Sequence, residues 1–230
     1  ALLFVCNSAM AWGGFAHSAI TEIAERNLTP QAREKIHHYL NHSLPYYATW
    51  MDYYRHFGVH QPTSYWHGLR TDNEGILVKV AHGNGAGLFQ TERIIKEMKN
   101  YKNMPDSVVR QNIIYLIHMI PDMHCPVHID FHISRPLRVQ VEGKEMKFHA
   151  MWDGYVITNR HTGCSPIQLA TELDTYSPEQ IAAVQQGDPM SWFHETVPAA
   201  QRALEMVPED KVLTPENYLN EAVVIAEERM

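Results

Sequence analysis

The chain contains 230 residues, of which 45% are hydrophobic and 20% are charged, so it can bury an ordinary core and intrinsic disorder is excluded. Its 19 Lys and Arg residues against 26 Asp and Glu residues give a formal net charge of −7, which argues against a broad basic face for duplex nucleic acid. The 15 histidines are the unusual feature of the composition, and several lie close to aspartates. A chain of this length is expected to form one domain or two small ones.

Residues 1–11 have the pattern of the end of a secretory signal peptide. The apolar stretch Ala1 to Val5 precedes Ala9-Met10-Ala11, whose small residues are typical of a cleavage site. We therefore expect a secreted or periplasmic protein that begins, once processed, at Trp12; a short buried N-terminal strand or helix is the alternative. No other segment approaches the roughly 18 uninterrupted apolar residues of a membrane span, so stable membrane insertion is not expected.

Helix-start signals recur along the rest of the chain. A capping side chain stands before a proline, which suits the first position of a helix, at Thr29-Pro30, Ser165-Pro166, Ser177-Pro178, Asp188-Pro189 and Thr214-Pro215. At Ser177 the capping box is completed by Gln180. Apolar residues three and four positions apart indicate helices at Ile20, Ile23, Ala24 and Leu28, at Val109, Ile113, Leu116, Ile117 and Ile120, and at Ala222, Val223 and Ala226. An all-α fold is predicted.

One segment departs from the helical pattern. Apolar and polar residues alternate on both sides of Glu142-Gly143, which predicts a small β-hairpin; the apolar positions are Leu137, Val139, Val141, Met146 and Phe148. Residues 73–87 carry four glycines and are expected to form a loop. Nothing marks a domain boundary, so residues 12–230 are predicted to be a single multi-helix domain with this hairpin as an insertion. The closing amphipathic helix is expected to be truncated at Met230.

Two His–Asp pairs are the first candidates for chemistry. His118 and Asp122 are four residues apart in an apolar segment, as are His149 and Asp153, so the members of each pair share one helix face. His128 follows the first pair closely. Because an uncompensated buried charge costs several kcal/mol, a divalent cation would explain both pairs, and this ligand set suits zinc in an open catalytic site. A satisfied buried hydrogen bond is the alternative for either pair alone.

Five residues nearer the N-terminus are further candidates, and each has an ordinary explanation when taken singly. Trp12 and His17 could be a core aromatic residue and a helical histidine without a special role. Asp52 and Arg55, three residues apart, could form an ion pair within one helix. His67 could be a packed imidazole.

In order and spacing, these residues resemble the S1/P1 nuclease family, secreted trinuclear-zinc enzymes of one superfamily with the zinc-dependent phospholipases C. The matching pattern is Trp12-x4-His17, Asp52-x2-Arg55, His67, His118-x3-Asp122-x5-His128 and His149-x3-Asp153. The resemblance implies a first zinc held by Asp52, His67, His118 and Asp122. It implies a second zinc held by Trp12, through its free amine and carbonyl oxygen, by His17 and by the bridging Asp122. It implies a third zinc held by His128, His149 and Asp153.

The resemblance also implies an activity. With three Zn²⁺ per chain, the protein would hydrolyse single-stranded DNA or RNA to 5′-phosphorylated products by metal-activated water, and a nucleotide 3′-phosphate is a second possible substrate. Arg55, Asp52 and Asp122 are the implied catalytic residues; no protein partner is inferred. The alternatives are a zinc-dependent phospholipase C acting on phospholipid head groups and a zinc-binding relative with impaired catalysis. Gly68-Leu69-Arg70 after His67 differs from the base-binding pattern of the family's nucleases.

Two further sets of residues each have two open interpretations. Aromatic side chains near the metal motifs could stack on bases or, as is more common, belong to the core; they are Tyr53, Tyr54, Tyr65 and Trp66. Cys125 and Cys164 remain if Cys6 leaves with the signal peptide, and they could form a disulfide or stay free.

Overall fold

The computed structural model describes residues 12–72, 74–131 and 136–230, and helices dominate them, so the predicted all-α class is confirmed. Short helical turns labelled η1, η2 and η3 are 3₁₀ turns, and η4 and η5 are π-helical turns. In chain order the helices and turns are α1 (Gly14–Arg26), α2 (Pro30–Tyr39), α3 (Leu44–Tyr47), α4 (Trp50–Tyr54), η1 (Gly58–Tyr65), α5 (Gly87–Met98), η2 (Tyr101–Asn103), α6 (Asp106–His124), η3 (Pro126–His128), α7 (Phe148–Ala150), η4 (Met151–Tyr155), α8 (Val156–Arg160), α9 (Pro166–Leu173), α10 (Pro178–Val184), α11 (Pro189–Glu205), η5 (Pro215–Leu219) and α12 (Asn220–Arg229). The predicted signal-peptide remnant, residues 1–11, lies outside the described residues.

All five predicted helix starts are confirmed. In each, the capping side chain accepts a hydrogen bond from a backbone N–H of the first turn, and the proline is the first helical residue. The capping box predicted at Ser177 and Gln180 is present. Three more boxes occur at Ser165, Asp188 and Thr214, so side chains fix the beginnings of α9, α11 and η5 as well.

The predicted hairpin is also confirmed, as strands β3 (Arg138–Val141) and β4 (Lys144–Lys147). Its two-residue turn has positive φ angles at Glu142 (51°) and Gly143 (72°), which suits the tight turn of a twisted hairpin. Strand β5 (Val212–Leu213) adds to β3 in parallel. A separate parallel pair joins β1 (Leu69–Arg70) to β2 (Ile129–Asp130). Neither β5 nor the β1–β2 pair was predicted, because two-residue strands carry no alternation pattern.

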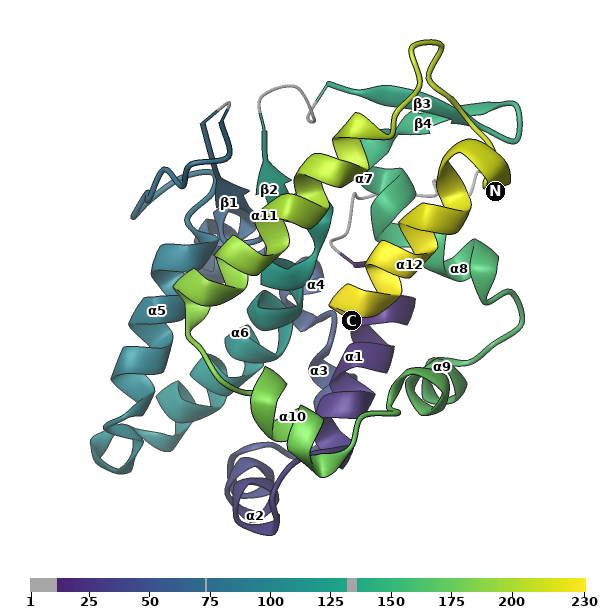
Figure 1. Cartoon of the computed structure of the whole chain (residues 1–230). Helices are drawn as coiled ribbons and strands as arrows, with labels where there is room; N and C mark the ends of the chain where they lie inside the picture. Colours follow the sequence, from purple (N-terminus) through teal and green to yellow (C-terminus); the bar gives the residue numbers. More distant parts are fainter. Residues whose placement is uncertain (1–11, 73, 132–135) are drawn as a thin grey trace, which may run out of the picture.

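Helix α6 runs through the middle of the molecule and is the main support of the site. It packs against α5 and α11, and Figure 1 shows α11 and α12 crossing the front of the molecule while the small sheet lies at one edge. The largest core cluster contains Trp12, Phe148, Trp152 and Tyr218, all nearly or fully buried. Residues 74–86 form turns and two isolated bridges before α5 begins at Gly87, as expected for a loop; residue 73 lies outside the described part.

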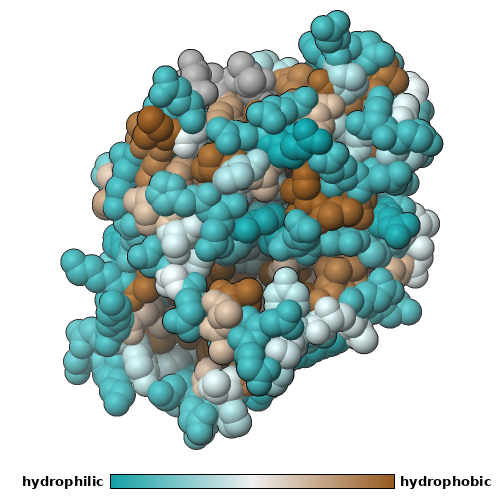
Figure 2. Space-filling view, viewed as in Figure 1, coloured by the Kyte–Doolittle hydropathy of each residue, from teal (hydrophilic) through white to brown (hydrophobic). Residues whose placement is uncertain are grey.

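Neither the surface view nor the apolar pocket beside α1 points by itself to the candidate ligands. Figure 2 shows a mostly hydrophilic face with scattered apolar patches. An apolar cavity of about 540 Å³ lies between α1, α2 and α6 and reaches the end of α12, but its lining includes none of the predicted metal ligands. Within the described ranges, no helix has both the length and the apolar character needed to cross a membrane.

Candidate metal centre

Helix α6 contributes the central pair of the site, one helical turn apart as predicted. His118 Nε2 lies 3.3 Å from Asp122 Oδ2, and both side chains are buried. The other ring nitrogen of His118, Nδ1, lies 2.7 Å from the carbonyl oxygen of Ala48. A hydrogen bond from Nδ1 to this carbonyl fixes the ring orientation and leaves Nε2 facing Asp122, which is the usual support of a metal-binding histidine.

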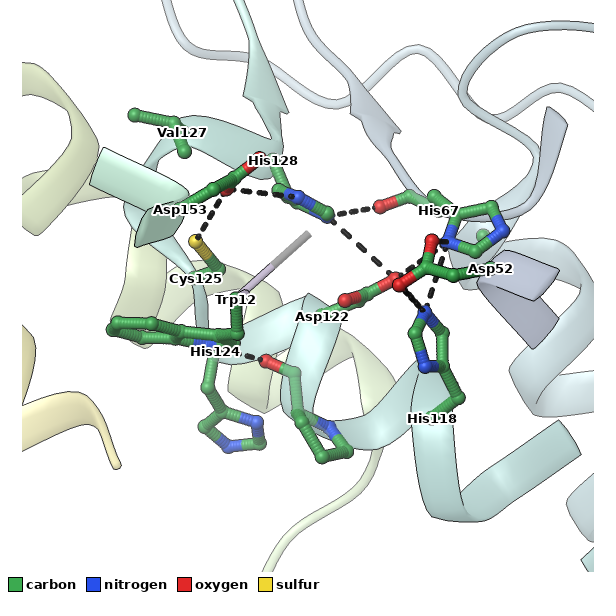
Figure 3. Close-up of polar contacts among 12 residues, drawn as sticks. Trp12, Asp52, His67, His118, Asp122, His124, Cys125, Val127, His128 and Asp153 are labelled. Carbon is green, nitrogen blue, oxygen red and sulfur yellow. Dashed lines mark hydrogen bonds and ion pairs between the residues drawn. The ribbon is translucent and has the colours of Figure 1, made fainter. Parts of the chain in front are cut away.

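Asp52 and His67 complete a first group around this pair. Helix α4 carries Asp52, and His67 follows η1. His67 Nδ1 lies 3.0 Å from both Asp122 Oδ2 and His118 Nε2, while the carboxylate of Asp52 lies 3.8 Å from each histidine. Asp52, His67 and His118 each offer a ligand atom within 4.8 Å of the others. Figure 3 shows these side chains pointing toward one another from three separate segments.

His17, from α1, forms a second group with the same α6 pair. Its Nε2 lies 3.2 Å from Asp122 Oδ1, and its ring stacks on that of His118 with centroids 4.2 Å apart. Asp122 therefore presents one oxygen to His17 and the other to His67 and His118. Trp12 is fully buried beside this group: its carbonyl oxygen contacts His17 Nδ1, and its indole N–H donates to the carbonyl of Pro121 at 3.1 Å.

A third group forms where η3, α7 and η4 meet. His149 Nε2 lies 2.9 Å from Asp153 Oδ2, and His128 Nε2 lies 3.7 Å from Asp153 Oδ1. The rings of His128 and His149 are stacked with centroids 5.1 Å apart. His128 also reaches the first group, because its Nδ1 lies 3.7 Å from Asp122 Oδ2 and contacts the carbonyl oxygen of His67. The three groups thus adjoin through Asp122.

Cys125 belongs to this third group and was missed as a candidate ligand. Its Sγ lies 4.0 Å from Asp153 Oδ1, and Cys125, His128 and Asp153 offer ligand atoms within 4.8 Å of one another. Its position between Asp122 and His128 is the signal that the sequence offers, whereas the cysteine count alone suggests only a disulfide or a free thiol. Cys125 and Cys164 are both free, so the open question of a disulfide is answered against it. Burial raises the pKa of the Cys125 thiol well above its ordinary value.

Arg55 lies at the end of α4 next to the first group. Its Nη1 is 3.4 Å from Asp52 Oδ1, and both side chains are largely buried. The alternative of an intrahelical ion pair is therefore present in the structure, and it places a guanidinium at the edge of the same group. His124, near in sequence, contacts the carbonyl of Ile120 at 2.8 Å and belongs to none of the three groups.

The three groups leave many buried polar atoms without hydrogen-bond partners, which is uncommon in folded proteins. Among the described residues these atoms are His17 Nε2, both oxygens of Asp52, His67 Nε2, Asp122 Oδ1, His128 Nε2 and Asp153 Oδ2. All of them except His67 Nε2 lie 2.9–3.8 Å from an imidazole nitrogen or carboxylate oxygen of another candidate ligand, and nitrogen with carboxylate oxygen is a donor set that suits zinc. The residues present therefore fit bound divalent cations.

The ionisation of these groups shows how protons and cations would compete for the site. Burial lowers the pKa of His118, but the carboxylates of Asp122 and Asp52 outweigh burial and raise it to about 9. Burial opposes the charge of Asp122 in turn, yet His118 and His128 hold its pKa well below the ordinary value. Burial lowers the pKa of His67. In the metal-free protein, protonated imidazole thus compensates the carboxylates, a role that a cation can take over.

Comparison with known proteins agrees with this geometry. No curated protein matches the chain. The sequence profile described as S1/P1 Nuclease, however, matches residues 12–230, which includes every residue of the three groups. Members of this family hydrolyse phosphoester bonds, and the structure contains His/Asp groups that could hold a metal ion. The chain belongs to the S1/P1 nuclease family.

Proposed function

We propose that the protein is a secreted zinc-dependent nuclease that hydrolyses single-stranded DNA or RNA to 5′-phosphorylated products. The observation that carries this proposal is the convergence of three adjoining groups of buried His and Asp side chains in a chain of the S1/P1 nuclease family. Several buried nitrogen and oxygen atoms of these groups make no hydrogen bond although they lie 2.9–3.8 Å from another candidate ligand, and a cation held between them would satisfy them.

In this proposal each group holds one zinc. The first zinc takes Asp52, His67, His118 and Asp122; the second takes Trp12, His17 and Asp122; the third takes His128, His149 and Asp153. The two oxygens of Asp122 face different histidines, which supports its role as the bridge. When bound, such cations lower the pKa of water toward neutrality and stabilise charge on a phosphoryl group. Cys125 is an additional donor available to the third group.

The chain's own residues orient and neutralise the substrate. Arg55, held by Asp52 at 3.4 Å, supplies a fixed positive charge at the edge of the centre, where it can stabilise the charge of a phosphate group. Asp52 faces the histidines and also pairs with Arg55. It would therefore fix the position of the guanidinium, which binds the phosphate, relative to that of the cation. Neutralisation by these local charges allows an acidic protein to bind a polyanion.

Exposed aromatic side chains near α4 and η1 favour a single-stranded nucleic acid as the substrate. Of the four aromatic residues near the metal motifs, three are exposed and do not belong to the core: Tyr53 (63%), Tyr54 (38%) and Tyr65 (47%). Phe57 is also exposed (54%) and its ring lies 5.6 Å from that of Tyr53. Bases of a single strand can stack on such rings, whereas paired bases in a duplex cannot reach them.

The test is hydrolysis by protein prepared to begin at Trp12. We expect cleavage of single-stranded oligonucleotides, fragments with 5′-phosphate ends, loss of activity in EDTA and recovery with Zn²⁺. Duplex DNA and phosphatidylcholine vesicles serve as comparison substrates. Zinc-loaded protein that cleaves no single strand contradicts the proposal, and release of phosphocholine from the vesicles would instead identify a phospholipase C.

A further inference from the structure

A second cluster of potential metal ligands lies apart from the centre around Asp122. Helix α8 is followed by His161, the turn before α9 carries Cys164, and Glu172 lies in α9. Each offers one ligand atom within 4.8 Å of the others. The cluster shares no residue with the three groups described above, and the family resemblance assigns none of its residues a role.

The distances within this cluster fit coordination better than hydrogen bonding. His161 Nδ1 lies 3.4 Å from Glu172 Oε2, and Cys164 Sγ lies 4.0 Å from Glu172 Oε1. The first distance is long for an N–H···O hydrogen bond, which usually spans about 2.9–3.0 Å. The second is at the outer limit of a weak S–H···O contact, and Cys164 Sγ also lies 3.5 Å from the carbonyl oxygen of Ser165. Two ligands on one tetrahedral zinc, with bonds of about 2.0–2.3 Å, lie roughly 3.3–3.8 Å apart. The side chains therefore need only a small adjustment to bind one cation.

A fourth residue holds His161 in the orientation that such a site requires. Glu227, from α12, lies 2.8 Å from His161 Nε2, so its carboxylate accepts a hydrogen bond from that nitrogen. Nδ1 is then left to face Cys164 and Glu172. A carboxylate on the far nitrogen of a metal-binding histidine is the common supporting arrangement of zinc sites, since it fixes the tautomer and makes the ligand more basic.

We propose that His161, Cys164 and Glu172 form a further zinc site, with Glu227 as a positioning residue. Imidazole, thiolate and carboxylate together select zinc or cobalt over calcium or magnesium. Glu172 and Cys164 are accessible to solvent, which gives the cation a route in and leaves water as the fourth ligand. The site joins α8, α9 and α12, and α9 packs on α1, so its role is to tie these helices together and not to cleave phosphoesters.

Cobalt substitution tests the proposal through the thiolate. The full chain has three cysteines, and Cys6→Ser leaves Cys125 and Cys164. With Cys125→Ala also in place, Cys164 is the sole thiol, and we expect added Co²⁺ to produce a near-ultraviolet sulfur-to-cobalt charge-transfer band that disappears when Cys164→Ala is added. Absence of the band from the protein that keeps only Cys164 overturns the proposal.

A second measurement uses an unchanged Cys164. In protein carrying Cys6→Ser and Cys125→Ala, Zn²⁺ should protect Cys164 from alkylation by iodoacetamide, and Glu172→Gln should abolish the protection. Glu227→Gln should weaken zinc binding 10- to 100-fold, while Glu228→Gln, one residue further along α12, should leave it unchanged. Equal alkylation with and without zinc refutes the site. Neither measurement depends on hydrolysis, so the outcome is independent of the nuclease proposal.

Discussion

Asp122 lies where the three His/Asp groups meet and contacts histidines of each. Its oxygens lie within 3.3 Å of His17, His67 and His118, and the side chain is 2% exposed. A carboxylate in this position can bridge two cations, whereas Asp153 contacts only the third group. In the proposed centre, Asp122 would contact two cations and Asp153 one.

Replacing Asp122 with Asn should thus remove two zinc ions per chain, because the neutral amide is a poor bridge, while the third zinc stays. Asp153→Asn, the matched control, should remove one. Elemental analysis of the purified, processed proteins gives the stoichiometry, and circular dichroism verifies that both variants fold. Loss of a single zinc from Asp122→Asn would show that it is not a bridge.

At the residue scale, the sequence predicts which His and Asp residues of a helix lie together, but it does not reveal every residue that lies beside them. Spacing of four residues correctly placed His118 beside Asp122 and His149 beside Asp153, since helix periodicity is a local property. Cys125 was missed because its role depends on the approach of Asp153, 28 positions away. The exposure of Tyr53 and Tyr65 likewise depends on what packs beside α4 and η1, which no local pattern reveals.

At the scale of elements, a chain of buried hydrogen bonds joins three segments behind the third group. Trp152 Nε1, in η4, donates to the hydroxyl of Tyr218 at 2.8 Å. That hydroxyl, in η5, donates to the carbonyl of Ala203 in α11 at 2.7 Å. Trp152 and Tyr218 are almost completely buried, so water cannot replace either bond. The π-helical turn that carries Asp153 is therefore anchored through its neighbour Trp152.

Tyr218→Phe should lower the free energy of unfolding by about 1–3 kcal/mol, because the indole N–H of Trp152 loses its buried acceptor. The exposed Tyr176, 50% accessible, provides the control, and Tyr176→Phe should change stability by less than about 0.5 kcal/mol. Urea denaturation measures both. Equal stability of the two variants would mean that the hydrogen-bond chain does not contribute.

An element can be predicted when its sequence signal is local. The starts of α9, α10 and α11 were predicted because a cap followed by proline acts locally. The addition of β5 to β3 was not, since it joins residues such as Gln140 and Val212 that are distant in sequence and carry no shared pattern. The π-helical form of η4 and η5 is also decided by packing and not by composition.

At the scale of the whole molecule, the N-terminal end of the described chain is built into the centre. Trp12 is fully buried, and the backbone N–H of Gly13 donates to the carbonyl of Asp153. A Cβ at Gly13 would lie only 2.9 Å from that carbonyl oxygen, so the close approach requires glycine. Trp12 thus lies fully buried beside the second group, with its carbonyl oxygen in contact with His17.

A preparation that retains residues 1–11 should therefore hold the second zinc more weakly than one that begins at Trp12, because an amide nitrogen is a poorer donor than a free amine. Elemental analysis and thermal denaturation of the two forms, produced side by side, provide the comparison. We expect the trimmed form to contain one more zinc and to melt at a higher temperature. Identical metal content in the two forms would argue against coordination by the terminal amine.

The residues around Asp122 come from separate stretches of the polypeptide, beginning with His17 in α1 and ending with Asp153 in η4. During synthesis on the ribosome, a nascent chain cannot gather this set until the segment that contains Asp153 has emerged. Partial translation products thus lack a complete centre.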